Sequence, residues 1–592
     1  MRVLNILRAA LVCAAATLPV PAATPANAYY QHNLVSDTAG VADFTDPNLI
    51  NPWGIATSAT SPFWVNDAGT GLSTVYTSSG SVSTTHAIVA PSAAGTSPAP
   101  ATAIVVGISG SFAVGPSHFS SFIFCTQDGA ISGWSSAQDA THAILEVDMS
   151  SAGAVFDGLA ISSGTVGPYI YAADFHNAKI DVFDGNWKPV SSMSFTDPNV
   201  PAGFAPFNIW NLSGKLYVTY AKQDANKHFD QAGAGNGYVA IFDLNGNLLQ
   251  HLISGGPLNS PWGVAIAPAN FGAFASDLLV GNFGDGTINA FDPSTGNYLG
   301  TLQDPNGNTI HLSGLWALIV GNGGSGGDPN AVYFAAGIGA EQHGLLGSLQ
   351  AAPVLSSDAV SNAADGMPVI APNMWVSIYG ANLAATTRSW TTKDFVNNAL
   401  PTSLDGVSVM VNGKQAYVGY VSAKQLNVLT PVDTPAGAPV SVQVSSNGLT
   451  GGSTTVPDMP YSPACFFYKT GPYVAALHSD NVTPVGPTTL FPNSSTPAKP
   501  GETVSIYATG FGDTNPQVAN GAVTTGRLPL ATTPVVTIGG VTAQVAFAGV
   551  TAPGLYQFNV TIPSSTPNGD AAVMISVGSF ATPAGGLITV QQ

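Results

Sequence analysis

A repeat of about fifty residues restricts the fold of this chain more than any other feature. The motif Pro-Trp-Gly-Ile-Ala at Pro52–Ala56 returns as Pro-Trp-Gly-Val-Ala at Pro261–Ala265. Related motifs stand at Ala101–Val105, Phe156–Ala160, Phe207–Trp210 and Ser313–Ala317. With Trp53, Thr102, Asp157, Phe207, Trp262 and Ser313 taken as equivalent, the steps between copies are 49, 55, 50, 55 and 51 residues. The sequence therefore contains six copies of one unit.

Each copy continues with further short apolar runs. A second run, such as Phe63–Asp67 or Tyr169–Asp174, precedes a turn with glycine or asparagine and then a third run. Runs of four to six β-branched and aromatic residues between turns predict strands. Only 8% of the residues are charged, which excludes long charged helices and coiled coils. Four strands per unit, repeated radially, are typical of a β-propeller. We predict an all-β fold with a six-bladed β-propeller over residues 29–352.

The two ends of the repeat region predict how the ring closes. The sixth unit has three apolar runs before Pro353, whereas the start of the region has an unassigned run at Tyr30–Val35. An incomplete blade would leave a strand edge exposed. We therefore expect Tyr30–Val35 to supply the missing outer strand of the sixth blade.

Two segments carry a resemblance to a known family. The first is Gln31–Tyr76, QHNLVSDTAGVADFTDPNLINPWGIATSATSPFWVNDAGTGLSTVY, and the second is Gly321–Leu349, GNGGSGGDPNAVYFAAGIGAEQHGLLGSL. They resemble the sequences of an uncharacterised family of secreted bacterial β-propeller proteins. Some members of that family end in a PEP-CTERM sorting tail, which this chain replaces with another region. The turns between runs also resemble NHL-type repeats more loosely. The resemblance implies a secreted propeller and no particular activity.

The C-terminal part contains a second repeat. Ala371–Leu383 matches Lys499–Phe511, Val407–Val421 matches Pro534–Val550, and Leu426–Gly448 matches Phe558–Ser579, with shifts of about 127 to 132 residues. Short alternating strands between turns predict two Ig-like β-sandwich modules. We place them at residues 353–456 and, with an N-terminal linker, at residues 457–592. The repeated motif resembles IPT/TIG-type domains, and the whole stretch resembles an Ig-like region of secreted acidobacterial proteins. The resemblance implies a spacer, stalk or adhesive role.

The N-terminus predicts export. Arg2 and Arg8 precede the short apolar stretch Ala9–Val20, and Ala26-Asn27-Ala28 fits a cleavage site, so residues 1–28 are predicted to be a signal peptide. We expect a secreted, periplasmic or cell-surface protein. No later apolar run is long enough to span a membrane. Cys125 and Cys465 are distant in sequence, and we interpret both as buried free thiols.

The charge of the chain restricts its partners. Residues 29–352 contain 22 acidic residues, five lysines and no arginine. Nucleic acid and anionic membranes are poor partners for such a surface. An extracellular protein, a glycan or another cell-surface component remains open as a partner, and we expect a monomer.

Propeller geometry points to one face of the ring as a candidate site. Strands alternate in direction, so the start of each first strand lies on the same face as the end of each second strand. Side chains on that face with oxygen ligands suit Ca²⁺ or Mg²⁺; the candidate metal ligands are Asp67, Asp174, Asn282 and Glu341. Further ligand-face candidates are Trp53, Asp157, His176, Asn208, Trp262 and His343. The alternative is turn chemistry, because Asp and Asn cap tight turns through their own backbone. The tryptophans also have two interpretations: their rings stack on sugar rings of a ligand, or they pack between blades.

Two functions are compatible with these patterns. The sequence lacks recognisable nucleophile–base motifs: the Gly-x-Ser-x-Gly match at Gly323–Gly327 lies in a glycine loop rather than at a strand–helix turn. The first hypothesis is therefore an exported binding or surface-interaction protein with a propeller head on an Ig-like stalk. The alternative is a metal-dependent hydrolase or lactonase acting at the channel mouth, which would need the four candidate ligands to meet around one cation.

Overall fold

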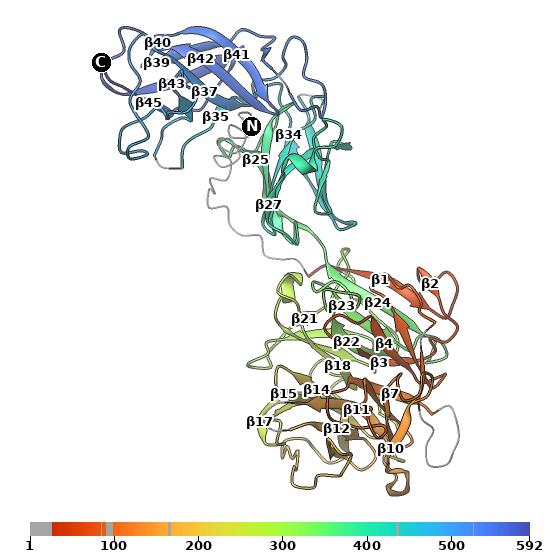
Figure 1. Ribbon diagram of the computed structural model, residues 1–592. Helices are drawn as coiled ribbons and strands as arrows, with labels where there is room; N and C mark the ends of the chain where they lie inside the picture. Colours follow the sequence, from red (N-terminus) through yellow and green to blue (C-terminus); the bar gives the residue numbers. More distant parts are fainter. Residues whose placement is uncertain are drawn as a thin grey trace. The chain divides into compact units, whose positions relative to one another are not determined.

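The chain folds as two compact units built almost entirely of β-strands (Figure 1). The computed structural model describes residues 27–84, 86–89, 99–163, 167–433, 437–469, 471–524 and 526–592. One unit comprises Asn27–Ala351 and the other contains Ala352–Gln592. The helices of the described ranges are three single 3-10 turns, η1 (Ser150–Ala152), η2 (Gly272–Phe274) and η3 (Thr392–Asp394). No described helix has the length and apolar character needed to cross a bilayer. The predicted signal peptide, residues 1–28, lies outside the described residues apart from Asn27 and Ala28.

The described residues of the N-terminal unit form six sheets, in which all neighbouring strands are antiparallel except β1 and β2, which are parallel. In spatial order their strands are β3 (Pro52–Ala56), β4 (Phe63–Asp67), β5 (Leu72–Tyr76) and β6 (Ala87–Ile88); β7 (Ala101–Val106), β8 (Phe122–Thr126), β9 (Ala130–Trp134) and β10 (Ile144–Asp148); β11 (Phe156–Ser162), β12 (Tyr169–Asp174) and β13 (Lys179–Asp184); β14 (Phe204–Leu212), β15 (Lys215–Lys222), β16 (Gly237–Phe242) and β17 (Leu248–Ser254); β18 (Pro261–Ile266), β19 (Leu278–Asn282), β20 (Ile288–Phe291) and β21 (Tyr298–Thr301); and β22 (Leu315–Val320), β23 (Val332–Ala336), β24 (Leu345–Ala351), β1 (Tyr29–Ser36) and β2 (Phe44–Thr45).

The first strands of these sheets contact one another in a closed cycle. Strand β3 contacts β7, and the contacts continue through β11, β14, β18 and β22 back to β3. Each first strand is mostly buried, because it packs against a neighbouring sheet on either side. A sheet of this size cannot bury both faces alone, so the cyclic packing supplies the core of the unit.

The N-terminal strand closes the cycle. Strand β1 pairs antiparallel with β24 over Tyr29↔Ala351 to Ser36↔Leu345, and Figure 1 shows the two strands side by side. Tyr29 is fully buried; its ring lies 4.6 Å from that of Phe271, and its hydroxyl donates to the Phe271 carbonyl at 3.1 Å. The prediction that the segment Tyr30–Val35 completes the last sheet is confirmed.

The third sheet departs from the expected four strands. Beyond β13, Val190 N donates to Val182 O at 2.8 Å and Asp184 N donates to Lys188 O at 2.8 Å. Pro189 stands between these two bonds, opposite Phe183. The two bonds flank a non-hydrogen-bonded pair, so the nitrogen of Pro189 points away from β13, and this single bridge takes the place of a fourth strand among the described residues.

The described residues of the C-terminal unit form two pairs of sheets. The first pair consists of β25 (Val354–Asn362), β26 (Trp375–Ala381), β32 (Gln425–Leu429), β31 (Tyr417–Val421) and β27 (Arg388–Ser389), with β28 (Ser403–Leu404), β29 (Val407–Val411), β33 (Pro439–Ser446), β34 (Leu449–Pro457) and β30 (Lys414–Gln415). The second pair consists of β35 (Ala464–Cys465), β37 (Thr503–Thr509), β42 (Leu555–Thr561), β41 (Gln544–Ala552), β38 (Leu528–Pro529) and β36 (Ala476–Leu477), with β40 (Val541–Thr542), β39 (Val535–Ile538), β43 (Gly569–Val577), β44 (Phe580–Ala581) and β45 (Leu587–Val590). Each pair encloses its own apolar core. Cys125 and Cys465 are both buried free thiols, as predicted.

The two sheet pairs of this unit share a buried junction. Trp375 is 2% exposed, and its Nε1 donates to the carbonyl of Pro553 at 2.9 Å. Its backbone N–H donates to Thr509 Oγ1 at 3.2 Å. Gly554 packs so closely on the Trp375 indole that an added Cβ would lie 2.8 Å from Nε1. The first core also extends to Tyr507 of the second pair, so the halves are joined by packing as well as by the chain.

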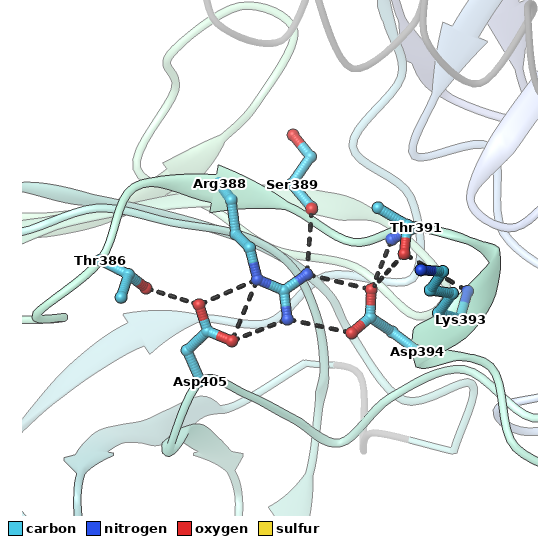
Figure 2. A network of polar contacts seen from close by, with 7 residues as sticks. All are labelled: Thr386, Arg388, Ser389, Thr391, Lys393, Asp394 and Asp405. Carbon is cyan, nitrogen blue, oxygen red and sulfur yellow. Dashed lines mark hydrogen bonds and ion pairs between the residues drawn. The ribbon is translucent and has the colours of Figure 1, made fainter.

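An arginine–carboxylate network braces the surface of the first sheet pair (Figure 2). Arg388 donates to both oxygens of Asp394, each at 3.0 Å, and its Nε and Nη2 donate to Asp405 at 2.7 to 3.0 Å. Hydrogen bonds from Arg388 lower the pKa of Asp394 to about 2 and also lower that of Asp405. Thr386 and Thr391 donate to the same carboxylates and fix their orientation. One guanidinium therefore joins β27 to the η3 turn and to the turn between β28 and β29.

Replacing Arg388 with glutamine is expected to destabilise the C-terminal unit by about 1 kcal/mol, because a partly exposed ion-pair network contributes modestly. Both carboxyl pKa values are depressed in the fold, so their stabilisation is present above pH 3.8 and is lost as the pH falls through about 2. Urea unfolding of the wild type should therefore show acid sensitivity that Arg388→Gln lacks. Lys393→Gln is the matched control, because it removes a neighbouring cation that forms no ion pair among the described residues. Equal acid sensitivity in all three proteins would exclude the network as its source.

Candidate functional site at one face of the ring

Strand register places three of the predicted metal ligands at equivalent positions. Asp67 stands opposite Pro52, Asp174 opposite Phe156 and Asn282 opposite Pro261. Each side chain therefore lies where the second strand of its sheet ends beside the start of the first strand. Carboxylate groups also occur in the other turns of this face, at Asp128, Asp230, Asp285 and Glu341. The expectation that acidic groups gather on one face agrees with this topology.

Asp67 lies in a buried acidic pair. It is fully buried; Oδ2 accepts from Thr74 Oγ1 at 2.8 Å and Oδ1 makes no hydrogen bond. Burial raises the pKa of Asp67 well above its usual range, and the nearby charge of Asp46 raises it further. Asp46 accepts from the Tyr76 hydroxyl at 3.0 Å and is 5% exposed. Burial therefore favours the protonated form of this carboxyl.

The raised pKa of Asp67 predicts a specific pH dependence. The folded unit binds a proton at this site that the unfolded chain releases above pH 3.8, so this site makes the N-terminal unit less stable as the pH rises from 3.8 through the folded pKa. Asp67→Asn replaces the proton with a neutral amide and should flatten that decline. Calorimetric melts between pH 4 and 8 test this, with the exposed Asp148→Asn as control. Parallel pH profiles for the wild type and Asp67→Asn would show that Asp67 is ionised in the fold.

The side chains of Asp174 and Asn282 form hydrogen bonds with neighbouring parts of the chain. Asp174 Oδ1 accepts from the backbone of Val155 at 3.2 Å and of Asn177 at 3.1 Å, while Oδ2 accepts from Asn177 Nδ2 at 2.7 Å. Asn282 Oδ1 accepts from Asn259 N at 3.1 Å, and its Nδ2 donates to Pro257 O at 2.8 Å. The bonds of Asp174 to Asn177 have the pattern of an Asp turn cap, whereas Asn282 joins the end of β19 to the segment that precedes β18.

Glu341 and the histidines also have local partners. Glu341 Oε2 accepts from Asn51 Nδ2 at 2.7 Å, and Asn51 Oδ1 accepts from Trp316 Nε1 at 3.2 Å. Burial raises the pKa of Glu341. His343 Nδ1 lies 2.7 Å from Asp37 Oδ2 at an exposed position. His176 is half-buried beside Gly153.

The axis of the ring is filled by aromatic side chains. Trp53 and Trp316 stack with ring centroids 3.4 Å apart, and Trp262 meets both edge to face. Trp53 and Trp262 are 4% and 1% exposed, which favours packing over sugar stacking for these rings. The register Leu315↔Ala336 makes Trp316 the equivalent of Trp53. The equivalence of Ser313 with Trp53 is therefore wrong by three residues, because β22 begins only at Leu315.

Asp157 is the carboxyl at this axial level. It is 1% exposed, and its Oδ1 accepts from Gln127 Nε2 at 3.2 Å. Burial raises the pKa of Asp157 well above its usual range, with a further contribution from Asp230. Trp262 Nε1 donates to the Asp157 carbonyl at 3.0 Å, and Asn208 Nδ2 donates to the Trp262 carbonyl at 3.0 Å. Asp157, Asn208 and Trp262 are thus brought together, chiefly by backbone bonds.

Sequence reasoning missed Asp46 and Asp230. Asp230 lies in the long connection between β15 and β16, and burial raises its pKa. Its charge also affects Asp157 and Glu341, so this connection reaches toward the ring axis. The unusual length of the β15–β16 connection was the available signal.

Among the described residues no group of three or more His, Cys, Asp or Glu side chains is arranged to hold a metal ion. Binding of Ca²⁺ or Mg²⁺ by Asp67, Asp174, Asn282 and Glu341 stays a prediction.

Sequence relatives establish the family. "Uncharacterized protein R648" of Acanthamoeba polyphaga mimivirus is 34% identical over 326 residues, which cover 53% of this chain and 78% of the viral protein. "Uncharacterized protein L690" of the same virus is 32% identical over 328 residues, covering 53% of this chain and 84% of that protein. The chain belongs to the R648 family. The names of these relatives state no activity, and the bacterial origin implied by the earlier resemblance stays a prediction.

This R648-family member also contains an IPT/TIG domain at residues 375–457. This match agrees with the IPT/TIG resemblance noted from the sequence. Among solved structures, a streptogramin B lyase is 12% identical with a TM-score of 0.34, covering 54% of this chain and 97% of that one. A gluconolactonase from Xanthomonas campestris is 14% identical with a TM-score of 0.22, covering 39% and 81%. Likeness at this level carries no conclusion about activity.

Proposed function

We propose that this R648-family protein is an exported binding protein, with a six-bladed propeller head followed by two Ig-like modules. The IPT/TIG domain carries the proposal, because domains of this type are commonly involved in interactions. The cyclic contacts of the six first strands support the propeller assignment, and the two enclosed cores of the C-terminal unit support two modules. The partner is an extracellular protein, glycan or cell-surface component, and the chain acts outside the cytoplasm as a monomer.

The bonding of the ring face also supports binding over turnover. Asp174 caps its own turn, Asn282 is hydrogen-bonded to the segment before β18, and the axis is packed with tryptophan. A reacting substrate would need an open space beside an available acid or base. The surface loops and the IPT/TIG domain are therefore the better candidates for contact with a partner.

A metal-dependent hydrolase or lactonase acting at this face is the second candidate. The observation in its favour is the set of three carboxyls whose pKa values burial raises, Asp157, Asp230 and Glu341; the charge of Asp230 raises the pKa of the other two further. Perturbed carboxyls gather at catalytic sites more often than elsewhere. Lactone and ester hydrolysis with added Ca²⁺, Mg²⁺ or Zn²⁺ measures this alternative directly.

A binding screen tests the first proposal. The intact mature chain is labelled and applied to an array of extracellular glycans and to fixed cells, with a heat-unfolded sample as control. Saturable retention without substrate turnover is the expected result. Metal-dependent turnover of a lactone or ester, without retention on any surface, would overturn the binding proposal in favour of the hydrolase.

A further inference from the structure

The second half of the C-terminal unit contains a hollow that the propeller-based proposal does not use. Its volume is about 620 Å³, within the ordinary range of small-ligand sites. Three segments form it: the turn from His478 to Thr483, the segment from Thr496 to Glu502, and the residues Gln591 and Gln592. Bridges between Val485 and Thr496 and between Ala498 and Val590 hold these segments together. The hollow is therefore built by residues distant in sequence and anchored to the sheet.

The acidic groups of the hollow are saturated by the chain itself. Asp480 accepts from the backbone of Val482 and Thr483, both at 2.9 Å, and from Thr483 Oγ1 at 2.6 Å. Glu502 binds His478 Nδ1 at 2.5 Å with one oxygen and accepts from Lys499 N at 3.0 Å with the other. These bonds fix the positions of the side chains that line the hollow and leave few carboxylate lone pairs for a metal ion. In agreement with this, the described residues contain no group of three or more His, Cys, Asp or Glu side chains that could hold a metal ion.

The groups left for a ligand are one ammonium and two neutral amides. Lys499 is exposed, and its ammonium has no ion pair among the described residues. The side chains of Gln591 and Gln592 line the same hollow and are also exposed. An amide both donates and accepts, whereas an ammonium only donates. A ligand with several hydroxyl groups matches this set, because each hydroxyl also donates and accepts.

The charges of the chain and of the hollow favour a neutral ligand over an anionic one. The whole chain has 32 acidic residues against 14 basic ones, so it repels anionic glycans at long range. Within the hollow, the single ammonium of Lys499 stands against the carboxylates of Asp480 and Glu502, so the hollow does not favour an anion. We propose that this hollow binds a neutral saccharide of one or two rings, held by the Lys499 ammonium and the amides of Gln591 and Gln592. The inference deepens the proposed binding function by naming a ligand class and a place.

Calorimetric titration of the intact chain tests the site. The probes are glucose, galactose, mannose and maltose, with glucuronate as a charged comparison. The double variant Lys499→Ala/Gln591→Ala removes contacts without touching the His478–Glu502 pair. Lys424→Ala removes the same charge from an exposed position outside the hollow and is the matched control. We expect saturable binding of at least one neutral sugar, weakened about tenfold or more in the double variant and unchanged in Lys424→Ala.

Other outcomes separate this inference from the wider proposal. No saturable heat with any neutral sugar, equal affinity in the double variant, or preference for glucuronate would each overturn the saccharide site. Array or cell binding that persists in the double variant would leave the binding function intact while placing its ligand elsewhere. Sugar binding by the hollow with no retention on arrays or cells would support the site and contradict the surface-interaction function.

Discussion

Substituting Tyr29 with alanine is expected to destabilise the N-terminal unit by about 3–5 kcal/mol, the usual cost of removing a large buried aromatic side chain. Tyr29 is fully buried, contacts Phe271 and Phe274, and begins the strand that pairs with β24. Its loss would loosen the only strand that joins the start of the unit to its last sheet in the described fold. The melting temperature of this unit should fall by roughly 5 °C or more.

Differential scanning calorimetry of the intact chain measures this effect. Tyr298→Ala is the matched control, because Tyr298 stands on an outer strand of the same unit and is 50% exposed. Its transition should remain within about 1 °C of the wild type, as expected for an exposed site. A Tyr29→Ala transition that coincides with the wild type would contradict ring closure through β1.

Replacing Trp375 with alanine is expected to separate the two halves of the C-terminal unit. The Trp375 indole donates to Pro553 and packs on Gly554, while its neighbour Asn373 lies 3.5 Å from the Tyr556 hydroxyl. Tyr417 adds a hydrogen bond to Asn520 at 3.0 Å. Because Trp375 also belongs to the first core, the substitution should cost about 3–5 kcal/mol. The single calorimetric transition expected for residues 352–592 should then become two.

A graded variant separates packing from hydrogen bonding at this junction. Trp375→Phe keeps an aromatic ring in the core but cannot donate to the Pro553 carbonyl. It should melt between the wild type and Trp375→Ala while retaining one transition. Two transitions already present in the wild type would show that the halves fold independently despite their shared core.

Local sequence patterns predicted where the strands lie more accurately than they predicted which residues are equivalent between the six copies. The apolar runs at Phe63–Asp67 and Tyr169–Asp174 are strands with the same bounds in the structure. In the sixth copy, the residue equivalent to Trp53 is Trp316 and not Ser313. A repeat of about fifty residues varies in length by several residues, so only the strand pairing Leu315↔Ala336 fixes the alignment of this copy.

The candidate site was less predictable, because its chemistry depends on contacts between distant segments. Asp67 was recognised from its turn, but Asp46, which influences its pKa, comes from a connection before the first repeat. The Trp375–Pro553 bond joins residues 178 apart, and no short motif encodes it. Residue type and spacing therefore located the polar face but did not indicate which side chains are already satisfied by the chain.

Metal titration of the ring face distinguishes hydrogen-bonded side chains from a metal centre. We infer that Asp174, Asn282 and Glu341 are held by hydrogen bonds within the fold beside a packed axis, and that the protein works by binding rather than by metal-dependent turnover. Isothermal calorimetry of the metal-free intact chain with Ca²⁺, Mg²⁺ and Zn²⁺, repeated with Asp174→Asn and Glu341→Gln, measures this. We expect any heat in the wild type to be unchanged in both variants. Saturable binding in the wild type that both substitutions abolish would contradict it and restore the metal centre.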